Sequence, residues 1–170
     1  LARSWRRVRP GPRRFEALAG LLLATVTLEG LAPSRGAALA ALEVEIASAV
    51  TPEGGIPSRN PEALARVFAQ LARIKADLLQ AEVTPPDALE DALKRMAGVL
   101  RTLRHADGTL ARFHGGGRGA PGLLDQALSM SGVRPTPLSD RAMGYARLSH
   151  ARTTLILDAA PPTTGPMSPQ

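Results

Sequence analysis

The stretch that decides the fold runs from residue 60 to residue 80 and reads N-P-E-A-L-A-R-V-F-A-Q-L-A-R-I-K-A-D-L-L-Q. Asn60 can cap a helix, Pro61 suits the first helical position, and Glu62 complements the free N–H groups of the first turn. Apolar residues then recur with the period of an amphipathic helix. They are Leu64, Val67, Phe68, Leu71, Ile74 and Leu78. The stretch therefore predicts a long helix with one apolar face.

Neighbouring stretches predict helices that pack against it. Thr84 as cap, Pro85 at the first position and Asp87 at the third predict the start of the next helix. The apolar stripe of this helix comprises Leu89, Leu93, Met96, Leu100 and Leu103. Upstream, residues 13–29 and a helix capped by Ser34 and ending near residue 50 carry similar stripes. Short turns separate these stretches, which predicts antiparallel helical hairpins.

The pattern changes after His105, which we expect at the end of a helix. An Asp-Gly turn and a run of glycines follow, and then a short helix over residues 123–130. Residues 142–149 and 153–157 read as two strands, with His150 in the turn between them. The predicted fold class is mainly α: helical hairpins in residues 1–134, followed by the first strands of an antiparallel β domain in residues 135–170.

Composition limits the function classes. The chain has 170 residues, enough for one domain, and 44% of them are hydrophobic. Only 3% are aromatic, which argues against a base-stacking nucleic-acid domain. Cysteine is absent, so disulfides and thiolate metal sites are excluded, and the three histidines lack metal-ligand spacing. We therefore expect no cofactor and no metal.

Positive charge is concentrated at the start of the chain. The net charge is +6, and six arginines precede the first acidic residue, so the rest of the chain is balanced. They are Arg3, Arg6, Arg7, Arg9, Arg13 and Arg14. Such an arm can contact nucleic acid or an anionic membrane, or it can be a solvated helix face or a frayed end. Nucleic-acid binding through the arm would weaken steeply as salt rises.

The ends of the chain suggest a fragment of a longer protein. The first residue is Leu1 rather than methionine, and the last strand is followed by a Pro- and Thr-rich tail. The apolar run over residues 17–28 is too short to span a bilayer, which takes about 20 residues. It has no clear cleavage site after it, so we expect a buried helix and no integral membrane segment.

Three segments together resemble bacterial heparinase II/III family proteins. They read E-G-G-I-P-S-R-N-P over residues 53–61, H-A-D-G-T-L-A-R-F-H-G over 105–115, and G-Y-A-R-L followed by T-L-I-L-D-A-A-P-P over 144–148 and 154–162. The resemblance implies the end of an (α/α) toroid in residues 1–134 and the start of a β-sandwich domain in 135–170. It also implies a polysaccharide lyase that cleaves uronic-acid glycans such as heparin by β-elimination. The fragment alone is expected to be inactive.

β-Elimination needs a group that neutralises the uronate carboxylate, a base and an acid. The resemblance suggests Asn60 as the neutraliser and Tyr145 for proton transfer. His114 is not carried over from the family, but a histidine on a loop near a cleft suits a proton carrier. Each has a simpler interpretation: Asn60 as a helix cap, His114 as an exposed loop residue, and Tyr145 as an aromatic that packs at a domain junction. Arg59 and Arg112 are candidates to hold an anionic sugar.

One departure from the family puts lyase activity in doubt. Ile56 stands where many members have histidine, and an isoleucine side chain cannot move a proton. The alternative prediction is therefore a non-catalytic helical module that binds anionic polysaccharide or a protein partner. The resemblance places the whole protein in the cell envelope or periplasm, with the cytoplasm left open, and the partner expected first is an anionic polysaccharide rather than nucleic acid. The oligomeric state stays open.

Overall fold

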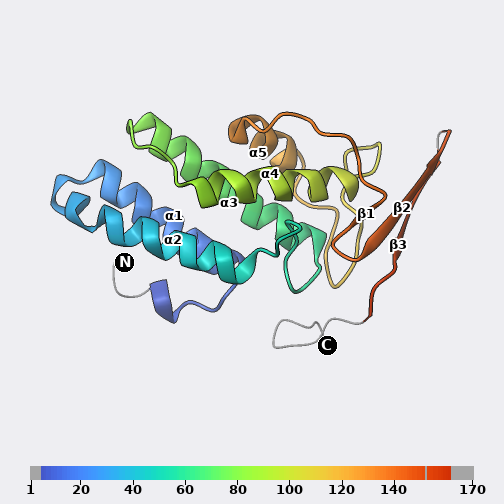
Figure 1. The fold of residues 1–170 in the computed structure, drawn as a ribbon, viewed down its shortest axis with the longest axis horizontal. Helices are drawn as coiled ribbons and strands as arrows, with labels where there is room; N and C mark the ends of the chain where they lie inside the picture. Colours follow the sequence, from blue (N-terminus) through green and yellow to red (C-terminus); the bar gives the residue numbers. More distant parts are fainter. Residues whose placement is uncertain (1–4, 152, 162–170) are drawn as a thin grey trace.

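Helices form most of the computed structural model, which describes residues 5–151 and 153–161 (Figure 1). The α-helices are α1 (Pro12–Thr27), α2 (Arg35–Ala49), α3 (Pro61–Gln80), α4 (Asp87–Thr102) and α5 (Leu123–Ser131). Short 3₁₀ turns cover Trp5–Arg7 and Glu29–Ser34. The strands β1 (Arg141–Ala142), β2 (Tyr145–His150) and β3 (Thr153–Asp158) form one small antiparallel sheet. The predicted class, mainly α with a few antiparallel strands at the C-terminal end, is confirmed.

Helix α3 is the centre of the helical body and packs against α1, α4 and α5. It begins where the sequence predicts, because the Asn60 side chain accepts a hydrogen bond from the N–H of Ala63 at 3.0 Å. The predicted apolar face is at most 1% exposed along its whole length. Each of its large side chains contributes roughly 1.5–3 kcal/mol by leaving water. This face therefore organises the core.

Helix α4 has the predicted apolar stripe but begins later than predicted. Leu89, Leu93 and Met96 are fully buried, as expected. The helix starts at Asp87 after Pro86, however, and Thr84 does not cap it. Pro85 precedes another proline, and a residue before proline is driven out of the helical conformation into an extended one. The helix can therefore begin only after the Pro-Pro pair.

The first two helices form a hairpin in which α1 packs against α3 and α2 packs against α4 (Figure 1). Phe15, Leu18 and Leu22 of α1 are buried, so the apolar run at the start of the chain is a core helix. Ser34 precedes α2 as predicted, but its side chain makes no capping hydrogen bond. No helix within residues 5–151 and 153–161 has the length and apolar character needed to cross a membrane.

Part of the arginine-rich start is folded onto the helices. The guanidinium of Arg14 donates to the carbonyl oxygen of Val8 and pairs with the buried carboxylate of Glu45 at 3.2 Å. Arg7 and Arg9 are exposed. Arg3 lies outside the described residues, and so does the side chain of Arg6. Within the described part, the arm is thus neither a free tail nor wholly buried.

The sheet lies at one end of the helical body, beyond the end of α4 (Figure 1). The predicted strand over residues 142–149 is broken into β1 and β2 by a two-residue turn, Met143–Gly144, in which both φ angles are positive (52° and 81°). Such a turn matches the twist of a hairpin. His150 is the last residue of β2 and pairs with Thr153, so it is not in the turn.

The two faces of the sheet differ sharply. Tyr145 and Ile156 point toward the helices and are 1% and 8% exposed. The opposite face carries Leu148, Leu155 and Leu157, which are 44–57% exposed. The period of two in side-chain direction explains this split. The division of the chain at residue 134 stays a prediction.

Candidate functional site

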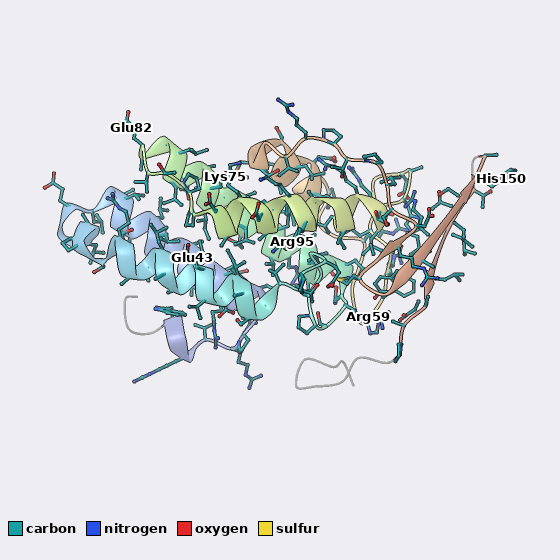
Figure 2. All side chains as sticks on the ribbon, in the orientation of Figure 1. Glu43, Arg59, Lys75, Glu82, Arg95 and His150 are labelled. Atoms are coloured by element: carbon teal, nitrogen blue, oxygen red, sulfur yellow. The ribbon has the colours of Figure 1, made fainter. Side chains whose placement is uncertain are left out.

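Four of the five residues predicted to carry function, all except Arg112, lie where the sheet meets the helical body. We call this place the helix–sheet junction and define it by Arg59, Asn60, Phe113, His114, Tyr145 and Asp158. Arg59 and Asn60 precede α3, Phe113 and His114 lie on the loop after α4, Tyr145 starts β2 and Asp158 ends β3. Figure 2 labels Arg59 at this place.

Arg59 contacts several of the segments that meet at the junction. Its guanidinium forms an ion pair with the carboxylate of Asp158 and donates to the carbonyl oxygens of Met143 at 3.1 Å and Pro161 at 2.9 Å. It also lies over the ring of Tyr145, 4.9 Å from the ring centroid. One side chain from the helical body therefore contacts the turn before β2 and the end of β3, which lie side by side at one end of the sheet.

Tyr145 is buried at the junction, with 1% of its surface exposed. Its hydroxyl donates to the carbonyl oxygen of Arg59, and its ring stacks on Phe113 with centroids 4.6 Å apart. Burial raises the pKa of the phenol well above its usual range, although the positive charge of Arg59 opposes this. The phenol stays protonated at neutral pH, and its proton is engaged by the backbone.

His114 and Asp158 form the exposed side of the junction. The Nε2 atom of His114 is 3.0 Å from Asp158 Oδ2. Partial burial raises the pKa of Asp158, but hydrogen bonds from Arg59, the Ala160 N–H and His114 outweigh it, so the net pKa is below the usual range. Asp158 is therefore a carboxylate at neutral pH, bonded to the side chains of Arg59 and His114 and to the Ala160 N–H.

Asn60 uses both ends of its side-chain amide. The oxygen caps α3, and the nitrogen donates to the carbonyl oxygen of His114 at 3.0 Å. The glycine run is held nearby: the N–H of Gly117 donates to Glu62 at 2.7 Å, which is the main reason that the pKa of Glu62 is lowered. A Cβ atom on Gly116 would lie 2.6 Å from Asn60 Oδ1. This glycine thus permits a close approach.

The other predicted residues lie apart. Arg112 is exposed on the same loop, and its side chain makes no hydrogen bond or ion pair with the described residues. Ile56 is buried, with 6% exposed. His105 lies beyond the end of α4, where its N–H donates to Thr109. Sequence reasoning missed Asp158; the available signal was a single acid at the end of an apolar strand.

Chemically, the junction is a set of satisfied contacts. The side chains of Arg59, Asn60 and Tyr145 all have partners within the chain. Within the described residues, no group of three or more His, Asp or Glu side chains is placed to hold a metal ion. The arrangement is suited to fastening the sheet onto the helices.

Comparison with known proteins indicates a different setting from the one expected. Over 152 residues, which is 89% of this chain, the sequence is 33% identical to "FtsZ-localized protein C" of Caulobacter vibrioides (strain NA1000 / CB15N). The chain spans about a quarter (26%) of the length of that relative. No family model matches the sequence, and no solved structure matches it.

These findings overturn the functional expectation. Membership of the heparinase II/III family is wrong, because no family model matches and the similarity found is to a protein named for its localisation with FtsZ. The polysaccharide lyase activity, the anionic polysaccharide partner and the polysaccharide-binding alternative are therefore withdrawn. The roles predicted for Asn60, His114, Tyr145, Arg59 and Arg112 followed from that reaction and are not carried further.

Proposed function

We propose that this chain is a segment of a bacterial cell-division protein that associates with FtsZ in the cytoplasm. The carrying observation is the 33% identity to FtsZ-localized protein C over 89% of this chain. A matched stretch of this length must contain residues 19–152, so it includes α2 to α5, β2 and most of the helix–sheet junction. The similarity thus extends over the helical body and does not rest on a short motif.

The geometry supports a binding role. The helix–sheet junction holds the sheet in a fixed position on the helical body. Arg59, Asn60 and Tyr145 do this through hydrogen bonds within the chain. Rigid presentation of a surface lowers the entropic cost of binding a partner. The chain therefore has the properties of a preorganised protein-binding segment.

Co-sedimentation with FtsZ polymers tests the proposal. We expect the full chain to pellet with polymerised FtsZ and to stay in the supernatant when FtsZ is kept unpolymerised. The pelleted fraction of the chain should reach a plateau as the FtsZ concentration is increased. The same chain fused to a fluorescent protein should colocalise with labelled FtsZ in dividing cells.

The arginine-rich arm requires a control, because a basic segment binds acidic polymers without specificity. A variant lacking residues 1–10 should retain co-sedimentation. Pelleting that disappears with the arm, or that is equal for FtsZ and for an unrelated acidic protein filament such as actin, would remove the support for specific association.

A further inference from the structure

An open groove lies beside the helix–sheet junction, between α4 and the chain that leads into β1. Its volume is about 630 Å³, within the range of about 300–1,000 Å³ typical of ligand sites. We call it the α4–β1 groove and define it by Arg95, Val99, Thr102, Thr136, Arg141 and Met143. A second hollow of about 390 Å³ adjoins it across Met143 and Gly144. The two hollows share Met143 and Gly144 in their linings, and both are open to solvent rather than enclosed.

The groove carries two arginines that the fold does not use. Arg95 on α4, labelled in Figure 2, and Arg141 on β1 are both exposed. Their side chains make no hydrogen bond or ion pair with the described residues. Glu53 is the sole acidic residue in the described lining and pairs with neither. The charge that faces the groove is therefore positive and unpaired.

Two other arginines near the groove, Arg101 and Arg147, differ from Arg95 and Arg141 because they donate to backbone carbonyl oxygens. Arg101 donates to the carbonyl oxygens of Val133 and Arg134, and Arg147 donates to those of Thr102 and Arg104. These bonds hold the segment before β1, and the sheet, onto the end of α4. Arg95 and Arg141 have no such task, so their charge is available to a ligand.

The groove is formed before any ligand arrives. The Thr102 hydroxyl oxygen accepts a hydrogen bond from the Ser139 N–H at 3.3 Å, which pins the segment that makes one wall. Val99, which is 6% exposed, and the half-buried Met143 line the same groove as the two arginines. The lining thus combines two guanidinium groups with two apolar side chains.

From this pattern we infer that the α4–β1 groove binds an extended acidic segment of FtsZ, with carboxylates on Arg95 and Arg141 and an apolar side chain over Val99 and Met143. The choice of FtsZ rests on the proposed function. The chemistry of the segment rests on charge complementarity: arginine guanidinium groups match carboxylates, and the apolar residues in the same lining favour a peptide over a free inorganic anion.

Charge reversal in the full chain tests the inference. The variants are Arg95→Glu, Arg141→Glu and the double variant, with Arg112→Glu as the matched control. Arg112 is also exposed and unpaired within the described residues, but it lies outside the groove. We expect the double variant to lose at least about tenfold in affinity for FtsZ polymers and the control to stay within about twofold. Unchanged thermal unfolding checks that each variant folds.

Peptide binding separates this inference from the proposed function. An array of overlapping FtsZ peptides should show binding to acidic members that contain apolar residues, and the double variant should lose it. If the wild-type chain pellets with FtsZ and the double variant does so equally well, the groove inference is overturned while the association with FtsZ stands.

A second probe covers the case in which FtsZ itself does not bind. A short synthetic peptide of alternating Asp and Val should still bind the wild-type chain. Inorganic phosphate should displace this peptide only weakly, and the double variant should bind it with lower affinity. Failure of the wild-type chain to bind both this peptide and the FtsZ array would overturn the inference.

Discussion

Gly54 offers the sharpest test of how the groove and the helix–sheet junction are built. It is buried in the loop between α2 and α3, with φ at +85°. A Cβ atom at this position would lie 2.5 Å from the carbonyl carbon of Arg95, in the backbone of α4. The loop therefore presses directly on the helix, and glycine is the residue that permits both the conformation and the contact.

The expected cost of Gly54→Ala has two parts. A left-handed backbone costs an L-residue roughly 1–2 kcal/mol. Overpacking against atoms that cannot rotate away costs about 1–3 kcal/mol more. The free energy of unfolding should therefore fall by about 2–5 kcal/mol, which for a chain of this size is a drop in Tm of at least roughly 4 °C.

The matched control is Gly20→Ala. Gly20 is exposed within α1, and a Cβ atom there meets nothing within 4 Å. Alanine in a helix is better than glycine by about 0.5–1 kcal/mol, so this variant should be more stable than wild type. Urea unfolding followed by circular dichroism measures both. A Gly54→Ala variant within about 0.5 kcal/mol of wild type would refute the tight loop–helix contact.

Three further predictions concern the junction. Asn60→Ala should cost about 1–2 kcal/mol in urea unfolding because the cap of α3 is lost, and Asn60→Asp should recover part of it; equal losses would contradict a capping role. Tyr145→Phe keeps the ring but removes the hydroxyl that bonds the Arg59 carbonyl, so Tm should fall by an amount equivalent to about 1 kcal/mol, and no change would show that this bond contributes nothing. The lowered pKa of Asp158 means that its carboxylate stabilises the fold above its unfolded-state pKa of about 4, and that this contribution is lost as pH falls. Asp158→Asn should therefore be less stable than wild type at pH 7 and should lose less stability between about pH 5 and pH 3, and an unchanged loss over that range would contradict this role of the carboxylate.

Helix boundaries were predictable where one local rule acted alone. Asn60 and Pro61 start α3 as predicted, because a cap and a proline at the first position are satisfied within a few residues. The predicted start of α4 is wrong because two prolines follow Thr84, and Pro86 drives Pro85 out of the helical conformation. The core stripes were right in both helices, since helical periodicity alone sets them.

The sheet and the junction depended on contacts distant in sequence. Met143–Gly144 splits a run that reads as one strand, and its positive φ values are stabilised by pairing of β1 with β2. Asp158 meets Arg59 across 99 positions, so no local pattern signals the pair. Asn60 and Tyr145 both lie at the junction, where their polar groups hold the loop after α4 and the start of β2.

The family expectation failed for a physical reason. The short motifs that suggested it are rich in glycine, proline and turn residues, and such segments are needed wherever chains approach closely. Gly54, Gly116 and Gly144 each have a neighbouring atom within 2.7 Å of where a Cβ would lie. Turn motifs of this kind can therefore recur in proteins of different function. They indicate where segments of the chain approach closely, and they do not identify the reaction that a protein catalyses.

By itself, the sequence determined the helical class, the buried stripes and the cap that starts α3, because each follows from periodicity or from hydrogen bonds within one turn of chain. Only the tertiary structure decided that Arg59 would join the helices to the sheet, that Tyr145 would be buried with its proton engaged, and that Arg95 and Arg141 would be left unpaired along one groove. These outcomes depend on which distant segments meet. That is set by the packing of the whole core rather than by any stretch of residues.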